Sequence, residues 1–159
     1  MKIDVYTDGS CSRNPGVGGY SAILRCGGLE RIVKGNVPMV TTNNAMELKA
    51  VVETIVWVNT HQKKPCVINI YTDSQYIIDC ACGKQKDGSK RLVGWFKGRS
   101  NEDLWMQLIN QTILGKHEIH FFKVKGHSGD ALNERANTIA QSECQKAKTK
   151  FYSGGQKNG

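Results

Sequence analysis

The sequence predicts a single α/β domain, built on a mixed β-sheet with helices packed against it. Near the amino terminus, apolar and polar residues alternate over 2–7, as in a strand with two unlike faces, and the two segments that flank Gly27-Gly28 have the pattern of a β-hairpin. Farther along, apolar residues recur at helical spacing in several segments, and a mostly apolar, β-branched segment at 66–72 lies between two of them. This order fits one sheet covered by helices. A chain of 159 residues has the length of one such domain.

The first three strands are predicted to form an antiparallel meander. Residues 2–7 alternate between apolar and polar side chains and form the first strand. Residues 9–19 follow as a predicted loop, because they contain several glycines and a proline. Residues 20–26 and 29–35 are then the strands of a hairpin, and the two glycines between them form its turn.

A helix and a buried strand are predicted to follow the meander. Asn43 and Asn44 are predicted helix caps, and the apolar residues after them keep helical spacing until Pro65 ends the segment. Residues 66–72 form the buried strand. Directly after it, Ser74 is predicted to cap a short helix.

The second half of the chain is predicted to add a basic protrusion, two helices and a fifth strand. Residues 83–100 carry six Lys and Arg residues against one Asp, which is typical of an exposed segment. A helix over 101–115, with Trp105 in the core, precedes a strand at 118–126. The last helix is predicted from Asn133 to about Lys148. We therefore predict a domain over 1–148 and a flexible tail over 149–159.

The composition favours a polyanionic partner. Lys and Arg number 22 against 14 Asp and Glu, which gives a net charge of +8 and a pI near 9.2. Such a balance favours nucleic acid as the partner, although a soluble protein can also be basic without one. The six cysteines have no metal-site spacing, and no signal peptide or membrane-spanning apolar run is present. We therefore expect reduced thiols in an intracellular, cytoplasmic protein.

Two strand ends carry nearly the same text, VYTDGS at residues 5–10 and IYTDSQ at residues 70–75. If the two strands are parallel neighbours, Asp8 and Asp73 emerge at the same edge of the sheet, where ligand sites gather. Glu47, near the start of the first helix, can point into the same crevice. Two carboxylates at ~4 Å repel each other by about 4 kcal/mol at an effective dielectric near 20, so the cluster calls for bound cations or raised pKa values. Oxygen ligands favour Mg²⁺ or Mn²⁺.

With these residues in place, the sequence resembles type 1 ribonuclease H, in its bacterial-like branch. The matching text is YTDGSCSRNPGVGGYSAIL, TTNNAMEL, IYTDSQY, NEDLW and VKGHSGDALNERANTIA, in the family's order over residues 3–144. The resemblance implies a ribonuclease H-like fold, with a five-stranded mixed sheet (three antiparallel strands, then two parallel ones) flanked by helices. It also implies an endonuclease that hydrolyses the RNA strand of RNA/DNA hybrids and leaves 5′-phosphate and 3′-hydroxyl ends.

The resemblance implies the catalytic residues as well. Asp8, Glu47 and Asp73 would hold two Mg²⁺ ions, with Mn²⁺ as a substitute, for activation of the attacking water and stabilisation of the departing 3′ oxygen. His127 matches a loop histidine that assists proton movement or product release. Asn137 stands where most members have a fourth carboxylate, and it lacks the charge. We therefore expect a more weakly held metal at that position and attenuated activity.

Substrate contacts are implied by further matching positions. Short polar groups that detect the 2′-hydroxyl of the RNA strand would come from Cys11, Asn14, Asn43, Asn44 and Gln75. Thr42 matches a residue that binds a DNA phosphate. The basic segment matches the family's protruding phosphate-binding handle, with Lys90, Arg91 and Trp95 as its expected contacts.

Several alternatives remain open at the level of the sequence. Asn137 can be a natural variant, an engineered change, or the mark of a module that binds hybrids without cutting them. Glu134 and Glu143, the nearest acids on that helix, are expected to point elsewhere. A transposase or integrase domain shares the fold and the two-metal chemistry and is the nearest rival enzyme. Because the chain starts with Met just before its first strand, we expect a free-standing enzyme. We also expect it to be a monomer.

Overall fold

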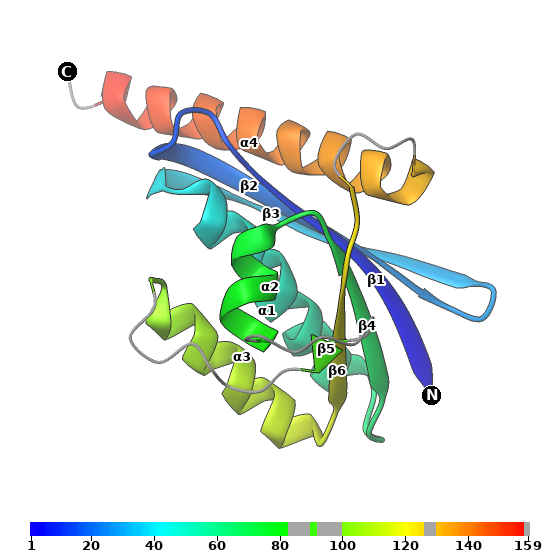
Figure 1. The fold of residues 1–159 in the computed structure, drawn as a ribbon. Helices are drawn as coiled ribbons and strands as arrows, with labels where there is room; N and C mark the ends of the chain where they lie inside the picture. Colours follow the sequence, from blue (N-terminus) through cyan, green and yellow to red (C-terminus); the bar gives the residue numbers. More distant parts are fainter. Residues whose placement is uncertain (83–89, 92–99, 126–129, 158–159) are drawn as a thin grey trace.

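The computed structural model describes residues 1–82, 90–91, 100–125 and 130–157, and Figure 1 shows their arrangement. In chain order the described elements are β1 (Lys2–Cys11), β2 (Gly16–Cys26), β3 (Leu29–Thr41), α1 (Asn43–His61), β4 (Val67–Thr72), α2 (Gln75–Cys82), β5 (Lys90–Arg91), α3 (Glu102–Gly115), β6 (Glu118–Lys123) and α4 (Ala131–Lys157). The predicted alternation of strands and helices is therefore confirmed.

The sheet has the strand order β3-β2-β1-β4-β6-β5. β1, β2 and β3 form the predicted antiparallel meander, and Cys26 pairs with Leu29 across the Gly27-Gly28 turn. β4 lies parallel to β1, and β6 lies parallel to β4. The five predicted strands are confirmed, and the two-residue β5 adds a short antiparallel edge beside β6.

Helices cover both faces of the meander. A Cβ added to Gly18 would meet the Met46 side chain of α1, whereas one added to Gly19 would meet the backbone of α4 at Ala140 and Cys144. Successive residues of a strand point to opposite faces, so α1 and α4 lie on opposite sides of β2. α3 packs on α1, and Figure 1 shows α4 crossing the sheet on the side away from α1 and α3.

The core lies between the sheet and the layer formed by α1 and α3. Val5, Ile70 and Phe121 from three neighbouring strands are fully buried against Leu48 and other apolar residues of α1. Trp105 of α3 is fully buried, as predicted, and its indole Nε1 donates a hydrogen bond to the Tyr76 hydroxyl at 3.0 Å. This layer supports the strands whose ends carry Asp8 and Asp73.

The predicted loop over residues 9–19 is mostly strand. β1 continues to Cys11 and β2 starts at Gly16, and Gly9 pairs with Tyr20 on the neighbouring strand. The glycines were interpreted as turn residues, but their function here is close packing. A Cβ at Gly9 would overlap the backbone of α1 at Glu47, and one at Gly19 would lie 2.6 Å from the carbonyl oxygen of Ala140. Glycine lets the helices approach the sheet backbone at these positions.

The starts of two helices differ from the prediction. Thr42, rather than Asn43 or Asn44, caps α1, because its extended backbone lets the side-chain oxygen accept a hydrogen bond from Ala45 N at 3.1 Å. α4 begins at Ala131 instead of Asn133, since the Asp130 carboxylate accepts hydrogen bonds from Leu132 N and Asn133 N. By contrast, Ser74 caps α2 as predicted, with its hydroxyl accepting from Ile77 N.

The far end of α4 also differs. The helix continues past Lys148, its predicted end, as far as Lys157 and takes in most of the predicted tail. The division into a domain and a tail stays a prediction. Of the predicted basic protrusion over 83–100, the structure describes Lys90 and Arg91 in β5 and Ser100 at its end.

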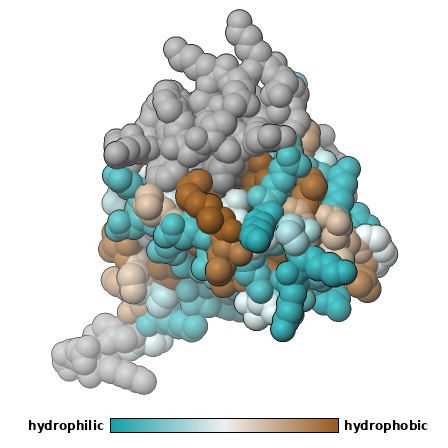
Figure 2. Space-filling model, turned by 90° about the horizontal axis from the view of Figure 1, so that it is seen from below, coloured by the Kyte–Doolittle hydropathy of each residue, from teal (hydrophilic) through white to brown (hydrophobic). Residues whose placement is uncertain are grey.

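Figure 2 shows the hydropathy of one face of the molecule. On the face seen from below in Figure 2, hydrophilic side chains predominate, and a smaller band of hydrophobic ones lies among them. In the part of the chain that the structure describes, no helix is long and apolar enough to cross a membrane.

Candidate active site

Two carboxylates meet because their strands are parallel and in register. Tyr6 of β1 pairs with Tyr71 of β4, so Asp8 and Asp73, each two residues farther on, leave the sheet at the same edge. β1 continues as a strand through Asp8, whereas β4 ends at Thr72 and lets Asp73 turn toward it. The predicted pairing of these two acids is confirmed.

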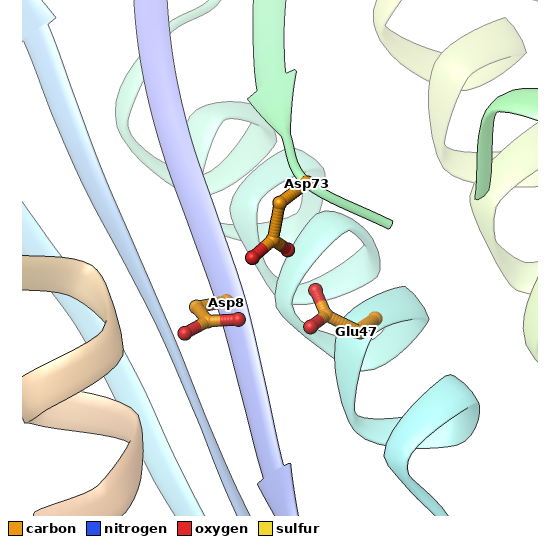
Figure 3. Close-up of side chains that lie close together, drawn as sticks. All are labelled: Asp8, Glu47 and Asp73. Carbon is orange, nitrogen blue, oxygen red and sulfur yellow. The ribbon is translucent and has the colours of Figure 1, made fainter. Parts of the chain in front are cut away.

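Glu47 joins them from the helix on one face of the sheet. It lies one turn into α1, and the missing side chain of Gly9 lets the helix backbone come close to β1 at this point. Figure 3 shows the three side chains pointing toward one another. Asp8, Glu47 and Asp73 each offer a carboxylate oxygen, and these three atoms lie within 4.8 Å of one another.

The cluster is electrostatically unfavourable without a counter-ion. Burial raises the pKa of Glu47 well above its ordinary value, and the neighbouring carboxylates of Asp8 and Asp73 raise it further. Its Oε2 is buried and accepts no hydrogen bond from the residues that the structure describes. Asp8 itself is only 5% exposed. A buried carboxylate oxygen without a donor fits a divalent cation, which takes oxygen ligands and neutralises the repulsion.

The three acids open into a hollow of about 280 Å³ at the end of the sheet. Its wall is formed by β1, α1, the end of β4 and the first turns of α4, with Asp8, Gly9, Ser10, Cys11, Asn43, Glu47, Asp73, Asn133, Glu134 and Asn137 as lining residues. Of the predicted site residues, Cys11, Asn43 and Asn137 thus lie beside the carboxylates.

Glu134 corrects an expectation. It was expected to point away from Asn137, but it lines the same hollow. Residues three apart on a helix are ~300° apart at ~100° per residue, which leaves the two side chains only about 60° apart around the axis. The first turn of α4 presents a face wide enough for both. Glu143 does point elsewhere, because its buried carboxylate pairs with Lys34 and Lys146.

Sequence reasoning missed three residues of the wall: Ser10, Asn133 and Glu134. Asn133 is a polar residue that is only 4% exposed, and it lies one turn before Asn137. Its spacing of four residues from Asn137 was the available indication, since residues i and i+4 share a helix face. Ser10 gave no comparable indication, because residues 9–19 were predicted as a loop.

The other predicted substrate residues have different neighbours. Asn14 Oδ1 accepts a hydrogen bond from Asn43 N at 3.2 Å, which joins the β1–β2 turn to the start of α1. Thr42 caps that helix, and Asn44 is exposed beside it. Gln75 is exposed on α2, where its amide donates to Asp79 Oδ1 at 2.7 Å. Neither Asn44 nor Gln75 lines the hollow.

The remaining predicted residues are only partly described. His127 and Trp95 lie outside the described residues. Lys90 and Arg91 form β5, where their backbones pair with Phe121 and His120 of β6. Their assignment to substrate binding stays a prediction.

Comparison with known proteins identifies the family. The model of the RNase H family matches residues 1–145. A ribonuclease H from Nitratidesulfovibrio vulgaris (strain Miyazaki F) is 41% identical over 146 residues, which cover 89% of this chain and 88% of the relative. A ribonuclease H from Caldicellulosiruptor saccharolyticus is 41% identical over 145 residues, which cover 89% of this chain and 94% of the relative.

Solved structures agree in fold. LC9-RNase H1, described as a type 1 RNase H with the type 2 active-site motif, superposes with a TM-score of 0.72 at 27% identity and covers 92% of this chain and 73% of that one. LC11-RNase H1, solved in complex with an RNA/DNA hybrid, gives a TM-score of 0.71 at 18% identity over 91% of this chain and 98% of that one. The second likeness concerns the fold alone.

The family match covers nearly the whole chain, and three carboxylates converge at one end of its sheet. The protein therefore belongs to the type 1 ribonuclease H family, whose enzymes cleave the RNA strand of RNA/DNA hybrids.

Proposed function

We propose that this ribonuclease H hydrolyses the RNA strand of RNA/DNA hybrids with two Mg²⁺ ions, for which Mn²⁺ can substitute, and leaves 5′-phosphate and 3′-hydroxyl ends. The observation that carries the proposal is the convergence of three carboxylates whose ligand atoms lie within 4.8 Å of one another. The buried, unpartnered Oε2 of Glu47 supports it, because a metal ion would supply the positive charge that the described residues around it do not.

The carboxylates hold and orient the reacting groups. When bound, two divalent ions supply an activated water and a stabilised leaving oxygen for in-line attack on the scissile phosphate. Asp8 and Asp73 are fixed by parallel strands, and Glu47 is fixed by a helix packed directly on β1. Rigid elements keep such a site in its productive geometry. Asn137 offers a neutral carbonyl oxygen on the same wall, and we propose that it contributes a weaker ligand than a carboxylate would.

Polar groups beside the carboxylates would recognise the RNA strand. The 2′-hydroxyl is both a donor and an acceptor, so the Cys11 thiol and the Asn43 side chain on the wall of the hollow can distinguish RNA from DNA. Asn14 holds the start of α1 in place from the neighbouring turn. We further propose that Asn44 and Gln75 extend this contact surface, that Thr42 binds a phosphate of the DNA strand, and that His127 assists proton movement or product release.

The enzyme is proposed to act as a monomer in the cytoplasm. One chain supplies all three acids of the cluster. Five cysteines that the structure describes, Cys11, Cys26, Cys66, Cys80 and Cys144, are free, which fits a reducing compartment.

A cleavage assay on three substrates tests the proposed function. An end-labelled RNA/DNA hybrid, a matched DNA duplex and single-stranded RNA are each incubated with the protein in Mg²⁺ or in EDTA. We expect only the RNA strand of the hybrid to be cut, and only in Mg²⁺. Cutting of all three substrates, or of none, would contradict the proposal.

A matched pair of variants shows whether the carboxylate cluster carries the activity. Asp73→Asn removes one charge of the cluster and should abolish cleavage of the hybrid. Asp103→Asn makes the same change on an exposed residue in the first turn of α3 and should leave cleavage unchanged. Full activity in Asp73→Asn would count against the assigned site.

A further inference from the structure

A second hollow lies between the β1–β2 turn and the last turns of α4. It has a volume of about 160 Å³, and its walls include Arg13 and Pro15 from the turn, Val40 from β3, and Lys148, Phe151 and Tyr152 from α4. Figure 1 shows the turn lying beside the carboxyl-terminal half of α4. The hollow exists because α4 continues beyond Lys148 as a helix.

Its chemistry combines aromatic rings with cations. Phe151 and Tyr152 are 46% and 57% exposed, and their rings meet edge to face with centroids 5.7 Å apart. Arg13 and Lys148, which line the same hollow, are also exposed. Among the described residues, no carboxylate pairs with Arg13 or Lys148, so both charges face solvent. Exposed aromatic rings beside unpaired cations are a candidate interaction surface.

Nucleic acid is the partner that fits this chemistry. Proteins bind single strands with cationic side chains that contact phosphates and aromatic side chains on which unpaired bases stack. In a duplex the faces of internal bases are covered by their neighbours, so the rings favour unpaired nucleotides. An apolar protein partner would not account for the two cations, whereas a phosphate backbone does.

The hollow lies close to the active site along the chain, because the β1–β2 turn follows directly after residues that line the carboxylate hollow. Cys11, on the wall of the carboxylate hollow, is two residues before Arg13, and Asn14 after it bonds to the start of α1. Arg13 lies five residues from Asp8, which limits the separation of their Cα atoms to about 17 Å at ~3.3 Å per residue. A strand that leaves the active site along the β1–β2 turn would therefore reach the hollow within a few nucleotides.

We propose that this hollow binds a single-stranded extension of the substrate, beyond one end of the hybrid duplex. Arg13 and Lys148 contact its phosphates, and an unpaired base stacks on Phe151 or Tyr152. The inference rests on the proposed function, since the hybrid in the active site delivers the extension. Neither contact requires a 2′-hydroxyl, so extensions of DNA and of RNA are both accepted.

Hybrids with and without an extension test this subsite. One duplex is prepared blunt and with a single-stranded extension of about six nucleotides, of DNA or of RNA, at either end. With the full chain in Mg²⁺, an extension at one end should lower KM about fivefold and leave kcat unchanged. Equal KM values for all substrates would overturn the proposal. A preference for only DNA or only RNA extensions would overturn the part that assigns recognition to phosphates and base faces.

Variants assign the effect to the rings and cations. The double change Phe151→Ala with Tyr152→Ala should remove the KM advantage of the extension, and the blunt hybrid should be cleaved as before. Phe151→Tyr with Tyr152→Phe preserves both rings and should retain the advantage. Ile113→Ala with Leu114→Ala makes a matched truncation of exposed apolar side chains on α3 and should change nothing. An advantage that survives loss of both rings would overturn the proposal.

Salt dependence tests the cations. Lys148→Gln should reduce the slope of log affinity against log salt concentration by about one for the extended hybrid and not for the blunt one. Lys63→Gln, on the exposed turn before β4, is the matched control. An unchanged slope in Lys148→Gln would contradict the assigned phosphate contact.

A binding measurement separates this proposal from the proposed function. Fluorescence anisotropy of a labelled single-stranded oligonucleotide in EDTA requires no cleavage. If the parent protein does not cut blunt hybrids, the proposed function fails, and weaker oligonucleotide binding by the alanine double variant would still support the subsite. If the parent cuts blunt hybrids and the double variant binds the oligonucleotide as tightly as the parent, only the subsite fails.

Discussion

The side chain of Asn14 and the backbone of Asn43 are joined by a hydrogen bond, although 29 residues separate them in the sequence. The Asn14 Oδ1 accepts from Asn43 N at 3.2 Å. Asn43 is the first residue of α1, and Glu47 lies one turn farther along the same helix. The β1–β2 turn therefore positions both a proposed substrate contact and one carboxylate of the site.

Asn14→Ala should weaken binding of the hybrid. The change removes the acceptor for Asn43 N and loosens the contact between the turn and α1, so we expect KM to rise about fivefold, as for a hydrogen bond of about 1 kcal/mol. The kcat value should fall by less than KM rises, because the carboxylates stay in place. Steady-state cleavage of a labelled hybrid measures both. Asn110→Ala, on the exposed face of α3, is the control and should change neither.

Asn137→Asp should raise the cleavage rate. A carboxylate at this position on the wall of the hollow would hold a divalent ion more tightly than the neutral amide does. We expect about a tenfold increase in kcat, equivalent to about 1.4 kcal/mol in the transition state, with little change in hybrid affinity. Gln141→Glu adds the same charge one turn farther along α4, on an exposed position, and controls for the general effect of charge. Equal or lower activity in Asn137→Asp would contradict this interpretation of Asn137.

Glu47→Gln should stabilise the protein in the absence of divalent ions. The pKa of Glu47 is raised in the folded state, chiefly by burial. At pH values above the ordinary pKa of a glutamate, the folded protein therefore keeps the carboxyl proton of Glu47 more tightly than the unfolded chain does. The free energy of unfolding therefore falls as the pH rises from the ordinary pKa toward the raised one. Gln has no ionisable proton, so the variant does not lose this stability. Each kcal/mol gained should raise Tm by about 2–4 °C.

Urea unfolding in EDTA at pH 8 and at pH 4 measures this effect. The variant should be more stable than the parent at pH 8 and close to it at pH 4, where the parent's carboxyl is mostly protonated in both states. In Mg²⁺ the order should reverse at pH 8, because the parent binds the ion through Glu47. A parent that is more stable than the variant at pH 8 in EDTA would contradict the electrostatic account of the cluster.

Gly19→Ala should destabilise the fold. The new Cβ would overlap the α4 backbone at Cys144 and lie 2.6 Å from the carbonyl oxygen of Ala140, so the helix would have to move away from β2. We expect a loss of about 2–3 kcal/mol in the free energy of unfolding. Gly28→Ala is the control, since nothing lies within 4 Å of the position of its Cβ. Denaturation in urea compares the two, and equal stability would show that α4 can shift without cost.

The strand pattern was sufficient to predict the order of the fold and the meeting of two acids. Alternation and β-branching mark strands directly, and parallel neighbours bring Asp8 and Asp73 to one edge because their strands end in matching sequences. The predicted loop over 9–19 failed for a physical reason. Gly9 and Gly19 are required by the close approach of helices from elsewhere in the chain, and no local pattern reveals such contacts.

The rest of the site depends on tertiary packing in the same way. Thr42 and Asp130 cap their helices because their side-chain oxygens reach free backbone N–H groups of the first turn. The observed helix starts differ from the predicted ones by a residue or two, and sequence propensities do not resolve so small a difference. Glu134 was excluded by its angle on the helix, but the way in which the first turn of α4 meets the sheet decides which side chains line the hollow. The aromatic end of α4 was predicted as tail, because its composition resembles a disordered segment.

The most direct test of the central claim is calorimetric titration of the protein with Mg²⁺, compared with the same titration of Asp8→Asn. The account predicts that the parent binds Mg²⁺ with release of a proton from the buried cluster, and that Asp8→Asn loses both the binding and the cleavage of the hybrid. If Asp8→Asn binds Mg²⁺ as tightly as the parent and cleaves the hybrid as fast, the claim that the three carboxylates form the metal site is contradicted.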